Sequence, residues 1–511
     1  MATLNWIGKQ AVVNHDKEVP FKLLKKVKSA SVGTSQNLIV HGDNLEALKA
    51  LMPHYQGRVK CIYIDPPYNT GNEGWVYNDN VNSPKIRQWL GKTVGPESED
   101  LSRHDKWLCM MYPRLVLLRN LLKLDGVIAV SMGDDEIHHL KILMNEIFGV
   151  QNFQGHIHWR RRHNQPNDKT KMLGLVGEHI LVYTKDAEKY KKAGVGKVEL
   201  TGKFTNPDND LRGDWATKPW KTGENQSGTR YKITSPSGKV FEEEWMGDEK
   251  NYLGLVKDSR IIFPKNGDGW PRKKYFKSER DEEGQCANNW WNYETFGSNQ
   301  DGTEELKDLF DGELVFENPK PTKLIKNIIN IANAKKGDIV LDSFAGSGTT
   351  GHAVMDLNND GEGLNFILIE LEAKVAKDIT AERVKRAIKK YDYKDGFEYC
   401  ELDKPLFNEH GQIEETCDFK QFATYIYFTE TQTNIDHAKV KANYIGEQNG
   451  TEYYLIYKGI QKNDLDKSFL KKLEKSDSKK IVYADRCTLD DSELAEYNVV
   501  FKQIPYEVKV Y

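Results

Sequence analysis

Cysteine is scarce in this 511-residue sequence, and no two cysteines lie close together. The six cysteines stand at positions 61, 109, 286, 400, 417 and 487, with no Cys-x-x-Cys pair among them. Structural zinc sites and the disulfide frameworks of small domains are recognised by closely spaced cysteines. We therefore predict neither a metal site nor a disulfide framework.

Long apolar runs and a strong net charge are also missing. No stretch is long and apolar enough to span a bilayer, and the N-terminus lacks the apolar core of a secretory signal. We therefore expect a cytoplasmic protein with no membrane partner. The formal net charge is only −3, so any nucleic-acid surface must be local. The length exceeds what one hydrophobic core supports, which predicts several domains.

The most informative stretch that is present runs Val-Lys-Cys-Ile-Tyr-Ile-Asp-Pro-Pro-Tyr-Asn-Thr-Gly from Val59 to Gly71. Its apolar first half predicts a strand buried on both faces. Pro66 and Pro67 have no N–H for a sheet ladder, so the strand must end before them. Ligands bind at the carboxyl ends of strands in open α/β sheets. We therefore predict that Asp65 and Tyr68 stand at the edge of a crevice.

Before this stretch, the sequence predicts an N-terminal segment and then a second strand that is followed by an acidic residue. Residues 1–36 are rich in lysine and predict an arm or a peripheral helix, either solvated or in contact with DNA. Residues 37–41 then predict a short strand, which leads into Asp43 and an amphipathic helix. From the residues alone, an N-cap role for Asp43 is favoured over a ligand contact.

Further strands are predicted at 126–131, 155–159 and 178–184, the last two as a hairpin-like pair. Between that pair lie Arg160, Arg161 and Arg162, which fit a phosphate clamp and a solvated charge run equally well. Residues 72–105 form a long polar segment, and a segment of that length predicts a functional or partner-ordered loop.

The character of the sequence changes between residues 190 and 315. Regular periodicity fades there, and six of the eleven tryptophans fall between Trp215 and Trp291. This predicts a loop-rich β domain inserted into the α/β sheet. Aromatic residues mixed with basic ones suit contacts with bases and phosphates, whereas a core role is the commoner explanation for each tryptophan. The basic candidates for DNA contact are Lys218, Lys221, Arg272 and Lys273.

A glycine-rich turn, Phe344-Ala-Gly-Ser-Gly-Thr-Thr350, lies between a predicted strand at 338–342 and a helix that continues to 357. Such a turn lets the backbone approach a nucleotide-like ligand, and Glu370, at the end of the next strand, can accept hydrogen bonds from ribose hydroxyls. A phosphate-binding P-loop would need a lysine where Thr349 stands. A ligand with a ribose but no pyrophosphate fits, and S-adenosylmethionine is one.

These two motifs together resemble those of the amino-methyltransferases that modify exocyclic nitrogens in DNA. The order, with Asp65-Pro-Pro-Tyr68 before Phe344-x-Gly-x-Gly348, resembles the circularly permuted β group, and the extended motif is similar to modification (Mod) subunits of type III restriction–modification systems. The resemblance implies a Rossmann-like α/β methyltransferase fold with a permuted, mostly parallel sheet. It also implies an inserted target-recognition domain and a small C-terminal α/β domain.

The resemblance further implies roles for individual residues. Asp65, Pro66, Pro67 and Tyr68 would be catalytic. The implied cofactor-binding residues are Asp43, now against the cap preference, with Lys320, Pro321, Phe344, Gly346, Gly348, Thr349 and Glu370. Glu372 competes with Glu370 for the ribose, and Glu370 is preferred because it ends the apolar run.

The implied activity is transfer of a methyl group from S-adenosylmethionine to N6 of an adenine flipped out of duplex DNA. The alternatives are cytosine-N4 methylation, a chiefly DNA-recognising subunit of a restriction complex, and methylation of RNA. The implied partners are double-stranded DNA, a second copy of the chain and a helicase–nuclease subunit. The predicted segments are an arm (1–36), a methyltransferase domain in two parts (37–189 and 316–395), the recognition domain (190–315) and a dimer- or partner-contact domain (396–511).

Overall fold

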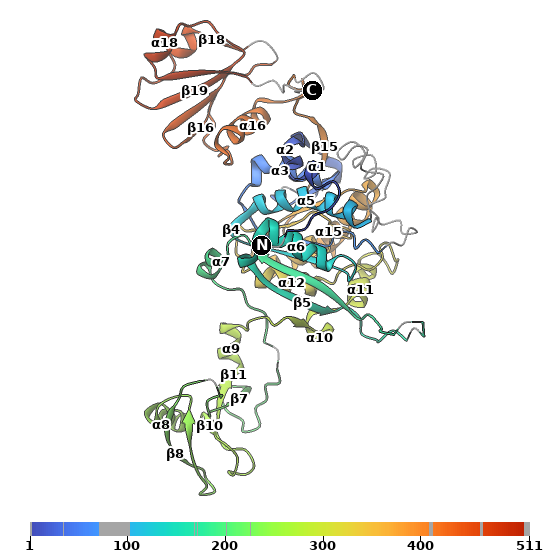
Figure 1. Cartoon of the computed structure of the whole chain (residues 1–511), viewed down its shortest axis with the longest axis vertical. Coiled ribbons are helices and arrows are strands. Elements are labelled where there is room, and N and C mark those ends of the chain that lie inside the picture. Colours follow the sequence, from blue (N-terminus) through green and yellow to red (C-terminus); the bar gives the residue numbers. More distant parts are fainter. Residues whose placement is uncertain are drawn as a thin grey trace. The chain divides into compact units, whose positions relative to one another are not determined.

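The computed structural model describes residues 3–33, 35–70, 103–167, 169–170, 172–200, 202–224, 226–407, 412–459 and 463–504. The functional loop that we predict for residues 72–105 lies outside these residues up to position 102. The chain forms two compact units, one made of Met1–Val195 with Asn288–Tyr511 and the other of Gly196–Ala287 (Figure 1).

Ten strands among the described residues form one large sheet in the first unit. In spatial order they are β1 (Lys22–Lys26), β15 (Glu398–Pro405), β2 (Leu38–His41), β14 (Asn365–Glu370), β13 (Ile339–Asp342), β3 (Val59–Ile64), β4 (Leu122–Met132), β6 (Gly177–Thr184), β5 (Phe153–Arg160) and β12 (Trp290–Trp291).

The sheet is mostly parallel, and its strand order is permuted relative to the sequence. β13 and β14 lie between β2 and β3 in space, although they follow both in the chain. Neighbouring strands from β15 to β4 run parallel, whereas β5 and β6 form an antiparallel pair and β6 also runs antiparallel to β4. The α/β class, the permuted order and the hairpin-like pair predicted from the sequence are confirmed.

Helices pack in two groups on this sheet. In the first group, α3 packs on α5 and α5 on α6; in the second, α12 packs on α13 and α13 on α15. Because side chains alternate along a strand, Ile62 and Ile64 enter the core shared with the first group. The helix bounds are α3 (Asn44–Tyr55), α5 (Arg103–Leu121), α6 (Ile137–Phe148), α7 (Ala187–Ala193), α10 (Tyr293–Phe296), α11 (Asn299–Leu309), α12 (Thr322–Ile331), α13 (Thr349–Asn359), α14 (Ala373–Val375) and α15 (Glu382–Tyr391).

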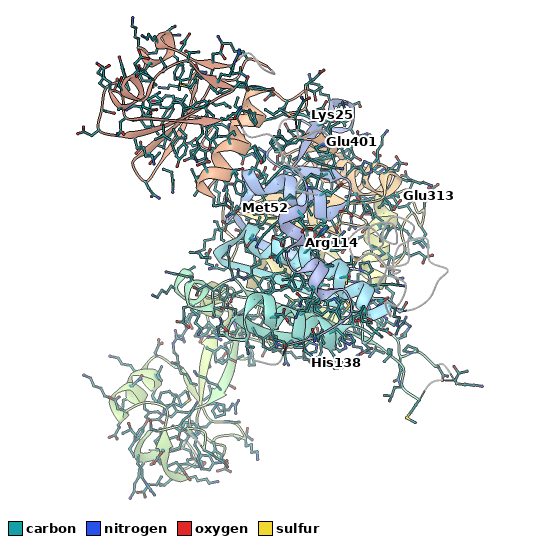
Figure 2. The ribbon with its side chains drawn as sticks, turned by 45° about the horizontal axis from the view of Figure 1, so that its top comes forward. Lys25, Met52, Arg114, His138, Glu313 and Glu401 are labelled. Atoms are coloured by element: carbon teal, nitrogen blue, oxygen red, sulfur yellow. The ribbon has the colours of Figure 1, made fainter. Side chains whose placement is uncertain are left out.

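The N-terminal segment contains two short peripheral helices and an edge strand of the sheet, and it is not a free arm. Helices α1 (Lys9–Val12) and α2 (His15–Glu18) pack on α5, and β1 forms the antiparallel edge of the sheet. Lys25 lies opposite Glu401 across that edge (Figure 2), and Lys22 is paired with Glu46. This strand is hard to recognise in the sequence because three of its five residues are lysines. Edge strands often carry such charged residues.

The second unit contains two small sheets and two helices among its described residues. β10 (Ile261–Ile262), β11 (Arg272–Phe276) and β7 (Trp215–Pro219) form one sheet, and β8 (Thr229–Thr234) pairs with β9 (Val240–Trp245). The helices are α8 (Glu249–Lys257) and α9 (Lys277–Glu283). Trp220 and Trp245 are buried in its core, so the core explanation applies to both. Trp270 is 43% exposed.

The unit ends at Ala287 rather than at the predicted residue 315, because β12 pairs with β5 of the large sheet. The unit begins at Gly196 rather than at the predicted residue 190. The predicted boundary at residue 396 also differs, since β15 still pairs with β2. After it, α16 (Phe419–Thr431) and a four-stranded sheet follow among the described residues. The strands are β16 (Tyr444–Gln448), β17 (Thr451–Leu455), β19 (Lys479–Ala484) and β21 (Val499–Gln503), with short elements β18 (Asp464–Leu465), α17 (Lys467–Leu470), β20 (Arg486–Cys487) and α18 (Asp491–Ala495) between them.

Within the part of the chain that is described, no helix combines the length and the apolar composition needed to cross a membrane.

Candidate active site

A cavity of about 520 Å³ opens in the first unit at the carboxyl ends of the central strands. Its size lies within the range of about 300–1,000 Å³ typical of small-molecule sites. The residues predicted from the sequence that line it are Asp43, Asp65, Pro66, Pro67, Tyr68, Arg161, Arg162, Lys320, Phe344, Gly346, Thr349 and Glu370. Arg160, Pro321 and Gly348 are not among its lining residues.

The sheet register explains why residues so distant in sequence meet here. β3 runs parallel to β13, with Ile62 opposite Leu341, and β14 runs parallel to β2, with Glu370 opposite His41. Asp65 follows β3 and Asp43 follows β2. Parallel neighbours end at the same edge of a sheet, so the two sequence motifs share one crevice.

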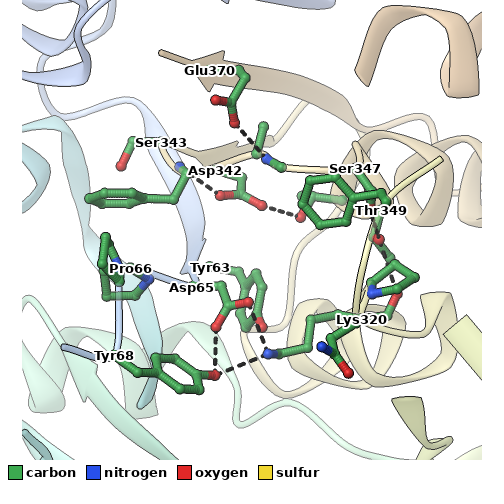
Figure 3. Close-up of a pocket in the computed structure, with 18 of the residues that line it drawn as sticks. Tyr63, Asp65, Pro66, Tyr68, Lys320, Asp342, Ser343, Ser347, Thr349 and Glu370 are labelled. Carbon is green, nitrogen blue, oxygen red and sulfur yellow. Dashed lines mark hydrogen bonds and ion pairs between the residues drawn. The ribbon is translucent and has the colours of Figure 1, made fainter. Parts of the chain in front are cut away.

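Asp65 and Tyr68 belong to a hydrogen-bonded group with a buried lysine (Figure 3). The Tyr68 hydroxyl lies 2.7 Å from Asp65 Oδ1, and Lys320 Nζ lies 2.9 Å from Asp65 Oδ2 and 3.0 Å from the Tyr68 hydroxyl. Burial acts to lower the pKa of Lys320, but the nearby Asp65 and Glu178 outweigh it, and the pKa of Lys320 is raised. Lys320 is therefore held as a cation against the Asp65 carboxylate.

Glu178 completes this group and was missed in the sequence. Its side chain is 1% exposed, and its Oε1 atom lies 2.9 Å from Lys320 Nζ and also contacts the Tyr68 hydroxyl. Its Oε2 atom lies 3.5 Å from Arg161 Nη1. The sequence does contain an indication of this role, because Glu178 is an acid in a mostly apolar strand. An ionised residue in a buried strand needs a partner of opposite charge or a hydrogen bond.

The glycine turn between β13 and α13 depends on its glycines. Gly348 is the residue before α13 and has a φ of 77°, a conformation that strains other residues. A Cβ atom there would come within 2.9 Å of the Thr380 carbonyl oxygen. Asp342, at the end of β13, accepts hydrogen bonds from the Phe344 amide (3.0 Å) and the Thr350 hydroxyl (2.6 Å). Burial raises the pKa of Asp342 to about 7.

Glu370 ties the end of β14 to the glycine turn. Its Oε2 atom accepts a hydrogen bond from the Gly346 amide at 2.9 Å, and its Oε1 atom accepts one from the Glu372 amide at 3.0 Å. Burial raises the pKa of Glu370 to about 7. Glu372 also lines the cavity but is half-buried. Glu370 is thus the acid that is hydrogen-bonded to the glycine turn, whereas Glu372 is a less buried residue of the cavity wall.

Asp43 serves as an N-cap and also lines the cavity. Its Oδ1 atom accepts hydrogen bonds from the amides of Leu45 (2.9 Å) and Glu46 (3.3 Å), which caps α3. Its Oδ2 atom lies 3.0 Å from Arg114 Nη2. The buried Arg114, labelled in Figure 2, was missed in the sequence because it lies within the apolar pattern of α5. The cap and the ligand contact considered for Asp43 are therefore compatible.

The three consecutive arginines do not act as one group. Arg160 ends β5 and its guanidinium lies over the Tyr293 ring, 4.9 Å from its centre, whereas Arg161 and Arg162 line the cavity. Arg161 Nε is buried with no hydrogen-bond partner among the described residues. Arg162 is exposed. Of the three arginines, Arg161 and Arg162 are therefore the two beside the cavity.

The basic candidates in the second unit divide into two kinds. Lys221 is paired with Glu243 at 2.9 Å, and Arg272 donates to the Thr217 hydroxyl at 2.8 Å. Lys218 and Lys273 lie directly opposite each other on β7 and β11. Burial and then the charge of Lys218 lower the pKa of Lys273. Like charges opposite each other destabilise a sheet, and an anion between them would relieve this repulsion.

Comparison with known proteins gives matches over most of the chain. A family model described as DNA methylase matches residues 59–382. The Mod subunit of the type III restriction–modification enzyme StyLTI from Salmonella typhimurium is 38% identical over 68% of this chain and 54% of its own length. The EcoP15I Mod subunit from Escherichia coli is 30% identical over 84% of this chain and 75% of its own length. The alignment thus spans about half of the Salmonella protein.

Proposed function

Because this chain belongs to the DNA methylase family, we propose that it transfers a methyl group from S-adenosylmethionine to N6 of an adenine in duplex DNA. The observation that supports this proposal most is that the segment around Asp65 and the glycine turn at Phe344–Gly346 line one cavity. A methyl donor held by the turn and an amino group held by Asp65 would then be neighbours.

The residues around the glycine turn fit the donor. Glu370 is a buried carboxylate at a strand end, where it can accept hydrogen bonds from the two ribose hydroxyls. Asp43 is held by Arg114 and by its role as a helix cap at the adjacent strand end, and it would accept a hydrogen bond from the adenine amino group of the donor. The donor supplies an electrophilic methyl group on a sulfonium.

The residues around Asp65 suit activation of an amino group. The nitrogen of an adenine amino group is a poor nucleophile because its lone pair is delocalised into the ring. Asp65 and the Pro66 carbonyl can accept its two hydrogens, which favours a pyramidal nitrogen with its lone pair directed at the methyl group. Asp65 would take up the proton that the amino group releases when it is methylated. Rate enhancement comes from orientation and placed dipoles.

The base is expected to leave the duplex and stack on Tyr68, because its amino group cannot be reached within the stack. Tyr68 and Lys320 each contact one Asp65 oxygen in the described structure, and a carboxylate oxygen can accept a further hydrogen bond from the amino group. We favour adenine-N6 over cytosine-N4 because aspartate rather than serine precedes the two prolines, as in the adenine-specific relatives that the motif resembles.

The direct test uses S-adenosylmethionine labelled in the methyl group. Label is expected to enter duplex DNA that contains target sites and not RNA of the same sequence, when both are assayed at the same salt concentration. Preferential labelling of RNA would contradict the proposed substrate. Absence of label from genomic DNA that lacks methylation would contradict the activity.

Binding of the donor is expected to strengthen with rising pH. The ribose hydroxyls need an ionised acceptor, and burial raises the pKa of Glu370 to about 7. The affinity for S-adenosylmethionine should therefore increase about tenfold between about pH 6 and about pH 8 and then level off. Isothermal titration calorimetry at several pH values measures this.

Two variants assign that pH dependence. Glu370→Gln should bind the donor weakly and with little change with pH. Asp342→Asn should retain the dependence, although the pKa of Asp342 is raised to about 7 as well, because Asp342 is bonded within the turn. The same pH dependence in wild type and Glu370→Gln would contradict the role of Glu370.

The second unit is proposed to contact DNA through Lys218 and Lys273. Each phosphate contact that is lost reduces the slope of log affinity against log salt by about 1. Exchange of both lysines for alanine should therefore weaken binding of duplex DNA and reduce this slope by about 2. Fluorescence anisotropy at several salt concentrations measures both. Lys232→Ala, which removes a 68% exposed lysine of β8, is the control, and an unchanged slope in the double variant would refute the contact.

Relatives named as Mod subunits of type III restriction–modification enzymes support a restriction–modification role for this chain. We propose a helicase–nuclease subunit as its partner. A protein that modifies chromosomal DNA would act in the cytoplasm. A chain that chiefly recognises DNA would copurify with such a subunit and still not label DNA by itself, which distinguishes the two functions. Association with a second copy of the chain stays a prediction, and analytical ultracentrifugation would test it.

A further inference from the structure

Three histidines lie together on the two strands that carry part of the candidate active site. His156 and His158 stand two residues apart on β5, and His158 lies opposite His179 on β6. Successive side chains of a strand point to opposite faces. Glu178 contacts Lys320 on one face, so its neighbour His179 points to the other. The three histidines therefore form a cluster behind the active site.

The distances within this cluster suit one metal ion. One ring nitrogen from each histidine can be chosen so that all three lie within 4.8 Å of one another. His156 Nε2 and His179 Nδ1 are 2.9 Å apart, and the ring centres are separated by 4.3, 4.9 and 5.6 Å. Tetrahedral zinc with Zn–N bonds of about 2.0–2.1 Å places its ligand nitrogens about 3.3 Å apart and its imidazole centres about 5 Å apart.

An acidic residue orients one of these ligands. His179 Nε2 lies 2.8 Å from Asp134 Oδ1, just beyond the end of β4. Because a carboxylate accepts hydrogen bonds, Nε2 carries the proton and Nδ1 has a free lone pair, directed at His156 Nε2 at 2.9 Å. Histidines that bind metals usually donate their second ring nitrogen to a carboxylate in this way.

We propose that His156, His158 and His179 bind a Zn²⁺ ion, with Asp134 orienting His179 and water completing the coordination. Imidazole ligands without thiolates suit zinc and its neighbours among the transition metals. The site goes beyond methyl transfer and does not depend on it. The sequence predicts no metal site because its cysteines are not closely spaced. His156 and His158 are close in the sequence, but the third ligand, His179, lies on another strand.

The ion would fasten β5 to β6 and to the end of β4. Glu178 and Trp159 lie opposite each other on β6 and β5 and alternate with the histidines. Trp159 is buried, and Lys320 Nζ lies 5.9 Å from the centre of its ring. Zinc binding would thus stabilise the strand pair from which Glu178 reaches the active site.

Calorimetric titration of ZnCl₂ into chelator-treated protein without a polyhistidine tag tests the site. We expect one ion per chain in wild type. Asp134→Asn should weaken binding about tenfold, as loss of a residue that orients a ligand does. His158→Gln and His179→Gln should weaken it more than Asp134→Asn. Wild-type protein that binds no Zn²⁺ would overturn the proposal.

His139→Gln is the matched control, because His104, Glu136 and His139 form the other group with ligand atoms within 4.8 Å among the described residues. It should leave zinc affinity unchanged. Loss of binding in His139→Gln with retention in His158→Gln would place the ion in that other group and overturn the proposal.

A second measurement does not depend on the folding of variants. Co²⁺ in a tetrahedral site absorbs visible light far more strongly than Co²⁺ in water. Wild type titrated with Co²⁺ should develop this absorption, and Zn²⁺ should displace it. The melting temperature of wild type should also rise with Zn²⁺ concentration. A weak octahedral spectrum together with an unchanged melting temperature would refute the site.

Discussion

Exchange of Asp65 for asparagine is expected to slow methyl transfer by at least about 10²–10³-fold, the range found when one placed electrostatic contact is removed from an active site. The amide retains the size of the side chain but offers an NH₂ group to Lys320 or to the incoming amino group. It also cannot take up the released proton. Single-turnover transfer of labelled methyl groups measures the effect.

The affinity of Asp65→Asn for S-adenosylmethionine is expected to stay within a few-fold of wild type, because Glu370 and the glycine turn are unchanged. Asp436→Asn, in which a 56% exposed acid is altered, is the control and should transfer methyl groups at the wild-type rate. An Asp65→Asn variant that retains more than about a tenth of that rate would contradict the catalytic role of Asp65.

Exchange of Lys320 for methionine is the second change with a large expected effect. Lys320 Nζ lies 2.9 Å from carboxylate oxygens of both Asp65 and Glu178, and Glu178 is 1% exposed. Removal of one partner from a buried ion pair typically costs about 3–5 kcal/mol. We expect the free energy of unfolding to fall by about 3 kcal/mol and methyl transfer to slow at least tenfold.

Denaturant titration and the single-turnover rate of Lys320→Met measure the two effects. Lys326→Met, on α12, removes an ion pair with Asp356 at 3.0 Å whose partners are 30% and 23% exposed. A similar loss in both variants would refute a particular role for Lys320.

The sequence predicts the parts of the site that local patterns specify. Two prolines must end a strand, and this placed Asp65 at the sheet edge. A glycine turn between a strand and a helix likewise located Gly346 and Gly348. Both predictions depend only on residues that are adjacent in the sequence, so they need no knowledge of the three-dimensional structure.

The remaining parts of the site depend on contacts between distant segments. Glu178 meets Tyr68 and Lys320 only after β6 has paired with β4, and Arg114 reaches Asp43 only after α5 has packed on α3. The boundary at Ala287 depends on the pairing of β12 with β5. The sequence predicts an arm or a peripheral helix for residues 1–36 because the lysines of β1 outnumber its apolar residues, such as Leu24, which packs on the core.

The identity of the methylated nucleoside tests the central claim most directly. Duplex DNA that lacks prior methylation is incubated with the protein and S-adenosylmethionine carrying a deuterated methyl group, then digested and analysed by mass spectrometry. We predict deuterated N6-methyladenine in wild type and none in Asp65→Asn. Deuterium in N4-methylcytosine would contradict adenine as the target, and deuterated N6-methyladenine at equal levels in both proteins would contradict the site.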